Sequence, residues 1–408
     1  MKRTVCLAHA TACAWLLLRA GGAESQVLPR LAATPEPDAG IVAVALRVAG
    51  GSADDTPAQS GRTQLAAMAA LAAVQPALDS LGARAEAECG RTSTGFLMLA
   101  PPETWEAAAR RFAAAIFAAA PDHQAISRAR RRLAGSTMLE NGNPTWQVRL
   151  VTRQALYGIH HSWTRPRCGF PETIEQIPDS VIAARAHTAF RPERAVAAVN
   201  GPIDVQQAEH VFGEWFSPSR VPTAASTLVP GDSVRVAERN TVTAWLGFAF
   251  PVTGPADPEA LRMVAFLLRD ATRPGPDRPA LLGSAVEIER HGGHAALFVF
   301  LVTEPDAVGN WLEQVPDLVR RTAASRMSAR TFQQHLQRFR GVRFRQLATP
   351  DARARRNADA LFFGTPLTHP DRAIDALTPD LLQQAAAALG PPARGIVGPA
   401  PVINRVPG

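Results

Sequence analysis

The sequence predicts an α+β protein made of two tandem homologous domains. Three observations lead to this fold class. Of the 408 residues, 46% are hydrophobic and only 19% are charged, which is ample apolar material for folded cores. Residues 217–232 contain three prolines and one glycine and break the periodic hydrophobic pattern near the middle of the chain. On both sides of this segment five successive elements follow in the same order, which indicates an internal repeat.

Each half is expected to run strand, helix, strand pair, helical stretch and closing strand. The strands show alternating apolar and small residues, the first helix is rich in alanine, and His291-Gly-Gly-His294 supplies a tight turn in the second strand pair. The helical stretches are expected to break near Pro121 and Pro316. The matching ranges are 41–48 and 241–250, 64–74 and 259–268, 84–100 and 284–303, 104–138 and 307–347, and 195–200 and 394–397.

The N-terminus has the pattern of an export signal. Lys2 and Arg3 precede an apolar stretch that ends at Leu18, and small residues suitable for cleavage follow up to Ala23. Residues 1–23 are therefore expected to be a signal peptide and the protein to be periplasmic or secreted; the alternative is an N-terminal helix of the mature fold. The remaining chain is expected to divide into a first domain, a linker and a second domain, at 24–216, 217–240 and 241–408.

Composition excludes several classes of function. The chain carries 43 Lys and Arg against 36 Asp and Glu, but Lys2 is the only lysine, so Schiff-base catalysis and a P-loop lack their amine. The arginines are dispersed and aromatic residues make up only 6%, which argues against nucleic-acid binding. No G-x-S-x-G, C-x-x-C or H-E-x-x-H motif is present. No stretch after the signal reaches the length of a membrane span.

Two cysteines remain once the signal is removed. Cys89 and Cys168 would then lie in a compartment where a disulfide persists. Two small buried thiols explain the same residues equally well, because a sequence does not give the distance between their Cα atoms. Both interpretations stay open at this point.

Several short segments occur in a characteristic order along the chain. They are Leu46-Arg-Val-Ala-Gly-Gly-Ser-Ala-Asp-Asp55, Gly61 at the start of a helix, Asn143-Pro144, Tyr157-Gly-Ile-His-His161 and Ala197-Ala-Val-Asn-Gly-Pro202. In this order and spacing the chain resembles the pitrilysin/insulinase (inverzincin) family of zinc metallopeptidases, which includes the mitochondrial processing peptidases and two-domain bacterial members. The resemblance covers essentially the whole mature chain. It implies two domains of the LuxS/mitochondrial-processing-peptidase-like type that form half of a clamshell.

The family's inverted zinc motif, H-x-x-E-H, is degenerate in this chain. In the matching segment Gln64 replaces the first histidine, Ala67 the glutamate base and Met68 the second histidine. The family's last ligand, a glutamate, corresponds to Ser136, or to Glu140 after a small shift of the alignment. A catalytic zinc needs three protein ligands and an open position, so the resemblance implies no metal, no other cofactor and no catalytic residue in this chain.

The resemblance also implies a role in partnership. In two-chain members of the family one subunit carries zinc and the other contributes an Arg and Tyr pair to substrate binding. Arg278 lies near the arginine position, whereas Gly283 or Ser284 occupies that of the tyrosine. The expectation is a non-catalytic subunit that forms a heterodimer with a zinc-bearing homologue and encloses peptide or unfolded protein. The alternative is a stand-alone periplasmic scaffold or peptide-binding protein without a peptidase partner.

Overall fold

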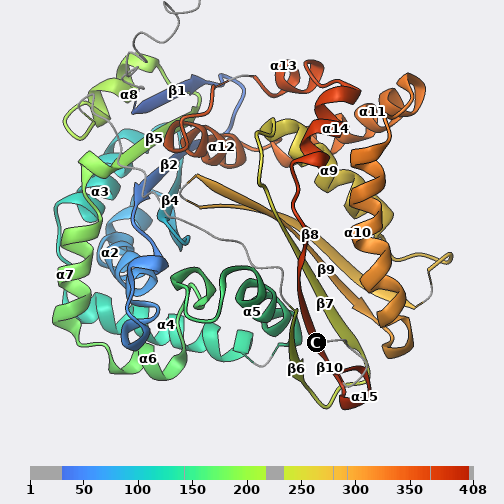
Figure 1. The fold of residues 1–408 in the computed structure, drawn as a ribbon. Helices are drawn as coiled ribbons and strands as arrows, with labels where there is room; N and C mark the ends of the chain where they lie inside the picture. Colours follow the sequence, from blue (N-terminus) through green and yellow to red (C-terminus); the bar gives the residue numbers. More distant parts are fainter. Residues whose placement is uncertain are drawn as a thin grey trace, which may run out of the picture.

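Two five-stranded sheets with the same strand order form the framework of the protein (Figure 1). The computed structural model describes residues 30–141, 143–216, 234–278, 280–291, 293–367 and 369–403. The first sheet has the order β1-β5-β2-β4-β3 and the second β6-β10-β7-β9-β8. In each sheet the first two strands of that order are parallel and the others antiparallel. The expected α+β fold with two homologous domains is therefore confirmed.

The strands of the first sheet are β1 (Leu31–Pro35), β2 (Val42–Ala49), β3 (Arg84–Cys89), β4 (Ser93–Ala100) and β5 (Ala195–Gly201). Those of the second are β6 (Val234–Glu238), β7 (Ala244–Pro251), β8 (Leu281–His291), β9 (His294–Thr303) and β10 (Ala393–Gly398). The helices of the first half are α2 (Arg62–Asp79), α3 (Trp105–Phe117), α4 (His123–Asn141), α5 (Pro144–Tyr157), α6 (Pro171–Gln176), α7 (Asp179–Ala189) and α8 (Val205–Phe212). Those of the second are α9 (Pro258–Ala271), α10 (Val308–Ala324), α11 (Ala329–Gln346), α12 (Pro350–Phe362), α13 (Pro370–Asp375), α14 (Pro379–Ala387) and α15 (Ala400–Ile403).

Helix starts follow from local sequence. Asn143 caps α5 by accepting a hydrogen bond from the backbone N–H of Thr145, and Asp257 caps α9 in the same way. A proline occupies the first helical position after each cap, where its missing N–H costs nothing. Helix α3 buries one face, whose apolar residues recur at helical spacing from Trp105 to Ile116 against the first sheet.

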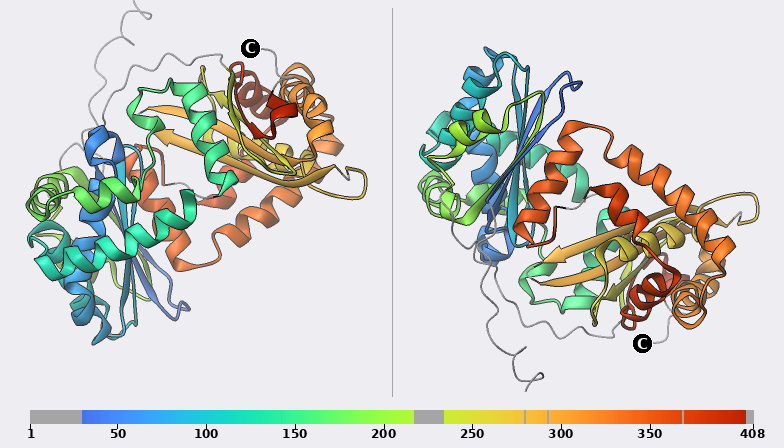
Figure 2. Two further views of the ribbon diagram at one scale, coloured as in Figure 1. Left: turned by 90° about the horizontal axis from the view of Figure 1, so that it is seen from below. Right: turned by 90° about the horizontal axis from the view of Figure 1, so that it is seen from above.

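Each sheet is covered on one face by helices of its own half and on the other by a helix from the opposite half (Figures 1 and 2). Helix α5 packs on β10 and β7 of the second sheet, and α12 packs on β2 and β5 of the first. Gly247 and Gly395, which pair across β7 and β10, permit the close approach of α5. A Cβ at Gly395 would lie 2.3 Å from the hydroxyl oxygen of Thr152 and 2.6 Å from its backbone nitrogen.

Ion pairs also stabilise the packing of α5 and α12 on the sheet of the opposite domain, which we call the exchange of α5 and α12. On the α12 side Arg353 binds Glu36 with Nη2 to Oε2 at 2.6 Å, and on the α5 side Arg149 binds Glu287 with Nη2 to Oε1 at 2.6 Å. Further pairs between the halves are Arg47 with Asp359, Arg153 with Glu289 and Arg355 with Glu86. The relative position of the two domains is thus fixed by packing and by charge on both sides of the cavity described below.

Several details differ from the sequence-based expectation. Strand β6 lies inside the expected linker 217–240, so the second sheet begins before residue 241. The rest of the linker up to residue 233 lies outside the described residues, and so does the expected signal peptide 1–23. The break expected at Pro316 was wrong, because Pro316 lies within α10. Burial of the neighbouring Val315 and Val319 offsets the lost hydrogen bond. The helix ends instead before Ser328, whose hydroxyl caps α11.

None of the described helices combines the length and the apolar character that crossing a membrane requires.

Candidate functional site

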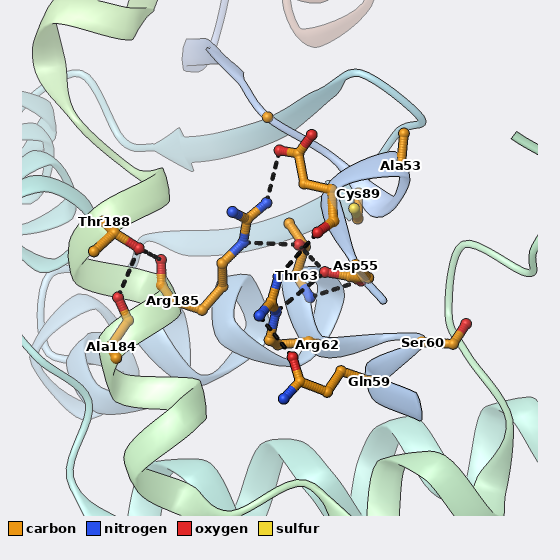
Figure 3. A network of polar contacts seen from close by, with 12 residues as sticks. Ala53, Asp55, Gln59, Ser60, Arg62, Thr63, Cys89, Ala184, Arg185 and Thr188 are labelled. Atoms are coloured by element: carbon orange, nitrogen blue, oxygen red, sulfur yellow. Dashed lines mark hydrogen bonds and ion pairs between the residues drawn. The ribbon is translucent and has the colours of Figure 1, made fainter. Parts of the chain in front are cut away.

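Helix α2 carries Gln64, Ala67 and Met68, where the resemblance places the metal site. A buried carboxylate anchors the start of this helix (Figure 3). Asp55 accepts hydrogen bonds from the backbone N–H of Thr63 at 3.2 Å and from its hydroxyl at 2.6 Å. Arg62 pairs with Asp55, and Arg185 donates to the hydroxyl of Thr63 at 3.0 Å. Burial raises the pKa of Asp55. A negative group at this position also interacts favourably with the helix dipole, so the first turn of α2 is held firmly.

Gln64 is bound to the edge of the first sheet through its side-chain amide. Its Oε1 accepts a hydrogen bond from the backbone N–H of Cys89 at 2.6 Å, and its Nε2 donates to the carbonyl oxygen of Ala87 at 3.2 Å. Both backbone groups lie on the outer edge of β3, which pairs only with β4 among the described strands. The amide thus takes the place that a peptide group of a neighbouring strand would occupy.

The other positions of the degenerate motif carry packing or exposed groups. Ala67 is fully buried, and Met68 packs against the core of the first domain. Ser136 is exposed on α4 and donates to the carbonyl oxygen of Leu133, one turn earlier. The side chain of Glu140 lies outside the described residues.

Cys89 and Cys168 are both thiols in the structure. Cys89 ends β3 and donates to the carbonyl oxygen of Gly90 at 3.2 Å. Burial, reinforced by the negative charge of Asp55 and by Cys168, raises the pKa of the Cys89 thiol to about 12. Cys168 is half-buried, and its carbonyl oxygen would lie 2.5 Å from a Cβ at Gly61. The two cysteines are thus neighbours beside the start of α2, and a disulfide between them stays a prediction.

Arg278 belongs to the second domain, whereas the degenerate motif lies in the first. It is exposed in the loop between α9 and β8, where one Nη donates to the carbonyl oxygen of Arg273 at 3.3 Å. Gly283 and Ser284, where the resemblance expects the tyrosine of the pair, lie in β8. The substrate-binding role of Arg278 stays a prediction.

A cavity of about 840 Å³ lies between the two domains. The first domain contributes residues of β2 and of the turn between β3 and β4, and the second contributes α9, β8, α11, α12 and α13. Glu88, next to the strand edge that Gln64 covers, lies on its wall. The cavity is therefore bordered on one side by β3, the strand to which Gln64 is hydrogen-bonded, and on the other by polar side chains of the second domain.

A second cluster, which the sequence does not predict, joins the domains beside this cavity. Trp163 of the first domain makes ring contacts with His291 and His294 of the second, with centroids 5.0 and 5.8 Å apart. His291 is hydrogen-bonded to Glu289 at 3.1 Å, and burial lowers the pKa of His291. Ion pairing with Arg153 and the hydrogen bond from His291 hold the pKa of Glu289 well below its usual value despite its burial. The only sequence signals were the two histidine pairs, His160-His161 and His291/His294, which the sequence places in different domains.

Solved structures with the same fold were found, although no protein-family model and no curated protein sequence matches this chain. A peptidase M16 inactive domain from Pseudomonas fluorescens matches with a TM-score of 0.77 and 16% identity, over 92% of this chain and 97% of that chain. A protease from Helicobacter pylori matches with a TM-score of 0.75 and 12% identity, over 90% and 96%. A chain of complex III2 from Candida albicans gives 0.75 and 13%, over 90% and 93%. This chain has the M16 peptidase fold.

The zinc ion of active peptidases with this fold does not fit the residues of this chain. The amide oxygen of Gln64 already accepts a hydrogen bond from Cys89, and the methyl group of Ala67 offers no donor atom. The thioether of Met68 is a soft ligand, whereas zinc sites of this type use imidazole and carboxylate. Within the described ranges no group of three His, Cys, Asp or Glu side chains is placed to hold a metal.

Proposed function

We propose that this protein is a non-catalytic relative of the M16 peptidases that pairs with a zinc-bearing homologue and helps to enclose peptide substrates. The single observation that carries the proposal is the state of Gln64, whose amide is bound to β3 where a metal ligand would be needed. The similarity in fold to a peptidase M16 inactive domain, over 92% of this chain, supports it. The expected signal peptide would place this activity in the periplasm or outside the cell.

In this role the chain supplies walls and orientation rather than chemistry. The exchange of α5 and α12 keeps the two domains at a fixed distance, and the cavity of about 840 Å³ between them offers room for a segment of peptide. Extended peptides often bind by adding a strand to a sheet edge. Gln64 already occupies two of the outward groups of β3, so peptide contacts would come chiefly from side chains that line the cavity.

The experiment that tests the proposal is reconstitution with a zinc-bearing homologue from the same source. The purified chain alone is expected to contain no stoichiometric zinc and to leave an unfolded peptide intact, and the mixture is expected to cleave it faster than the homologue alone. Metal content by atomic emission and cleavage by mass spectrometry give the readouts. Stoichiometric zinc together with cleavage by the chain alone would overturn the proposal.

A stand-alone scaffold or peptide-binding protein is the second candidate. The observation that favours it is Arg278, whose guanidinium contacts its own loop while the tyrosine position carries a glycine or serine. A scaffold would leave the activity of every zinc-bearing homologue unchanged, and it would form no complex with one in size-exclusion chromatography. The same reconstitution therefore decides between the two candidates.

A further inference from the structure

The cavity between the domains carries more positive than negative charge. Nine arginines and five carboxylates line it, an excess of four positive charges if the histidine is neutral. All five carboxylates are already engaged within the protein. Asp257 caps α9, and the other four accept from arginines. The cavity therefore contains more arginine side chains than carboxylates that could neutralise them.

The excess is concentrated around Glu259 at the start of α9. Glu259 is buried and binds Arg262 and Arg343, each with an N to O distance of 2.6 Å. Arg290 of β8 and Arg356 of α12 lie close enough for the charge of Glu259 to act on them. We call these four arginines the Glu259 cluster. Burial lowers the pKa of Arg290, Arg343 and Arg356, because each loses hydration on this wall.

Arg290 is the arginine of the Glu259 cluster whose positive charge is least neutralised by paired carboxylates. Its guanidinium makes no hydrogen bond and no ion pair with any residue that the structure describes, although it is half-buried beside Arg262 and only the more distant charges of Asp257, Asp359 and Glu259 act on it. A partly buried cation without a partner destabilises a fold unless another group neutralises it. A guanidinium also presents a planar fork of donors that matches a carboxylate in two-point contact.

We propose that the Glu259 cluster binds the side-chain carboxylates of an acidic peptide segment that enters the cavity between the domains. This inference rests on the proposed function, namely that the cavity encloses peptide, and it names the class of peptide. A volume of about 840 Å³ far exceeds the needs of a single inorganic anion and matches pockets that bury extended organic ligands. Because the arginines come from α9, β8, α11 and α12, neighbouring carboxylates would meet them from several directions.

Fluorescence anisotropy with two matched labelled peptides tests the inference. One twelve-residue peptide carries a run of Glu and Asp, and the other has Gln and Asn at the same positions. The acidic peptide is expected to bind the wild-type chain at least tenfold more tightly at low salt, and the difference is expected to shrink as salt screens the charges. Arg290→Gln is expected to weaken binding of the acidic peptide about tenfold and to leave the neutral peptide unchanged.

Arg320→Gln is the matched control, since it removes the same charge from an exposed position on α10 that does not line the cavity. It is expected to change neither affinity by more than about twofold. A thermal scan adds a readout that does not depend on the label. Arg290→Gln is expected to raise the unfolding midpoint without peptide, because it removes an uncompensated cation, and to abolish most of the further rise that acidic peptide gives the wild type.

The outcomes separate this inference from the proposed function. Equal binding of acidic and neutral peptides overturns the acidic specificity and leaves the proposed function standing. Loss of acidic binding in Arg320→Gln as large as in Arg290→Gln overturns the Glu259 cluster as the site. Inorganic phosphate that binds as tightly as the acidic peptide, and displaces it, assigns the cluster to small free anions and overturns the peptide ligand. Failure of both peptides to bind overturns the Glu259 cluster as a peptide site, and the proposed function is then decided by the reconstitution alone.

Discussion

Replacing Gln64 by alanine should destabilise the protein, because the side chain satisfies two main-chain groups at once. The Cys89 N–H that it binds is buried, so without Gln64 this donor is left unpaired, at a cost of about 2 kcal/mol. The carbonyl oxygen of Ala87 is on a partly exposed residue and can turn to water, so its loss adds about 1 kcal/mol. The free energy of unfolding in urea is therefore expected to fall by about 3 kcal/mol for Gln64→Ala.

Two further variants sharpen this test. Gln75→Ala lies on the same helix, where the amide binds only the exposed Asp79, and it should cost less than about 0.5 kcal/mol. Gln64→Glu can donate to Ala87 only when protonated, so the folded state raises the pKa of this carboxyl. Its stability relative to wild type should then be highest at low pH and fall as pH rises through that pKa. If Gln64→Ala proved as stable as Gln75→Ala, the amide of Gln64 would not be stabilising the edge of β3.

Three other expectations follow from the packing and the buried groups. Gly395→Ala should lower the free energy of unfolding by about 1–3 kcal/mol, measured in urea, since its Cβ would collide with Thr152 on α5. The lowered pKa of His291 means that the unfolded chain binds more protons near pH 6, so stability should fall as pH drops below about 6.5; His291→Gln should show a flatter curve of unfolding midpoint against pH. In the native protein at pH 8, Cys89 should resist alkylation because its pKa of about 12 keeps it a thiol, whereas half-buried Cys168 reacts first. The same assay in denaturant should then titrate both thiols in a chain that begins at residue 24, whereas a disulfide between Cys89 and Cys168 would leave none.

The sequence predicts the elements whose signal is local. Strands β4 and β9 lie within the ranges expected from hydrophobic alternation, β2 and β7 match theirs but run one residue further, and α2 and α9 include the expected helices with longer ends. Strands β1 and β6 escaped prediction because each has only five residues of intermediate or high exposure. They are held by parallel pairing with β5 and β10, more than 150 residues further along the chain. Such long-range pairing leaves no periodic pattern in the short strand itself.

In the candidate site too, residue identities can be predicted from the sequence, whereas contacts between distant segments cannot. The replacement of metal-binding side chains at Gln64, Ala67 and Met68 is visible in the sequence once the resemblance fixes the alignment. The bonds from Gln64 to β3 depend on which backbone groups of that strand face outward, and this is set by pairing with β4. The Glu259 cluster collects arginines that are up to 94 residues apart in the sequence, from Arg262 to Arg356. The excess of arginine is visible in the sequence, but only the fold brings these four to one wall.

The exchange of α5 and α12 explains how a cavity can keep its shape when the residues of a metal site are absent. Each sheet buries its inner face under a helix of the opposite domain, so neither domain is complete without the other. Arg353 with Glu36 and Arg149 with Glu287 fix the same contact from both sides. The wall formed by α9, β8 and α11 is thus positioned by apolar packing and ion pairs that do not involve the start of α2. Substitutions at the start of α2 therefore leave the arginines of α9, β8 and α11 in place, as the proposed peptide-binding role requires.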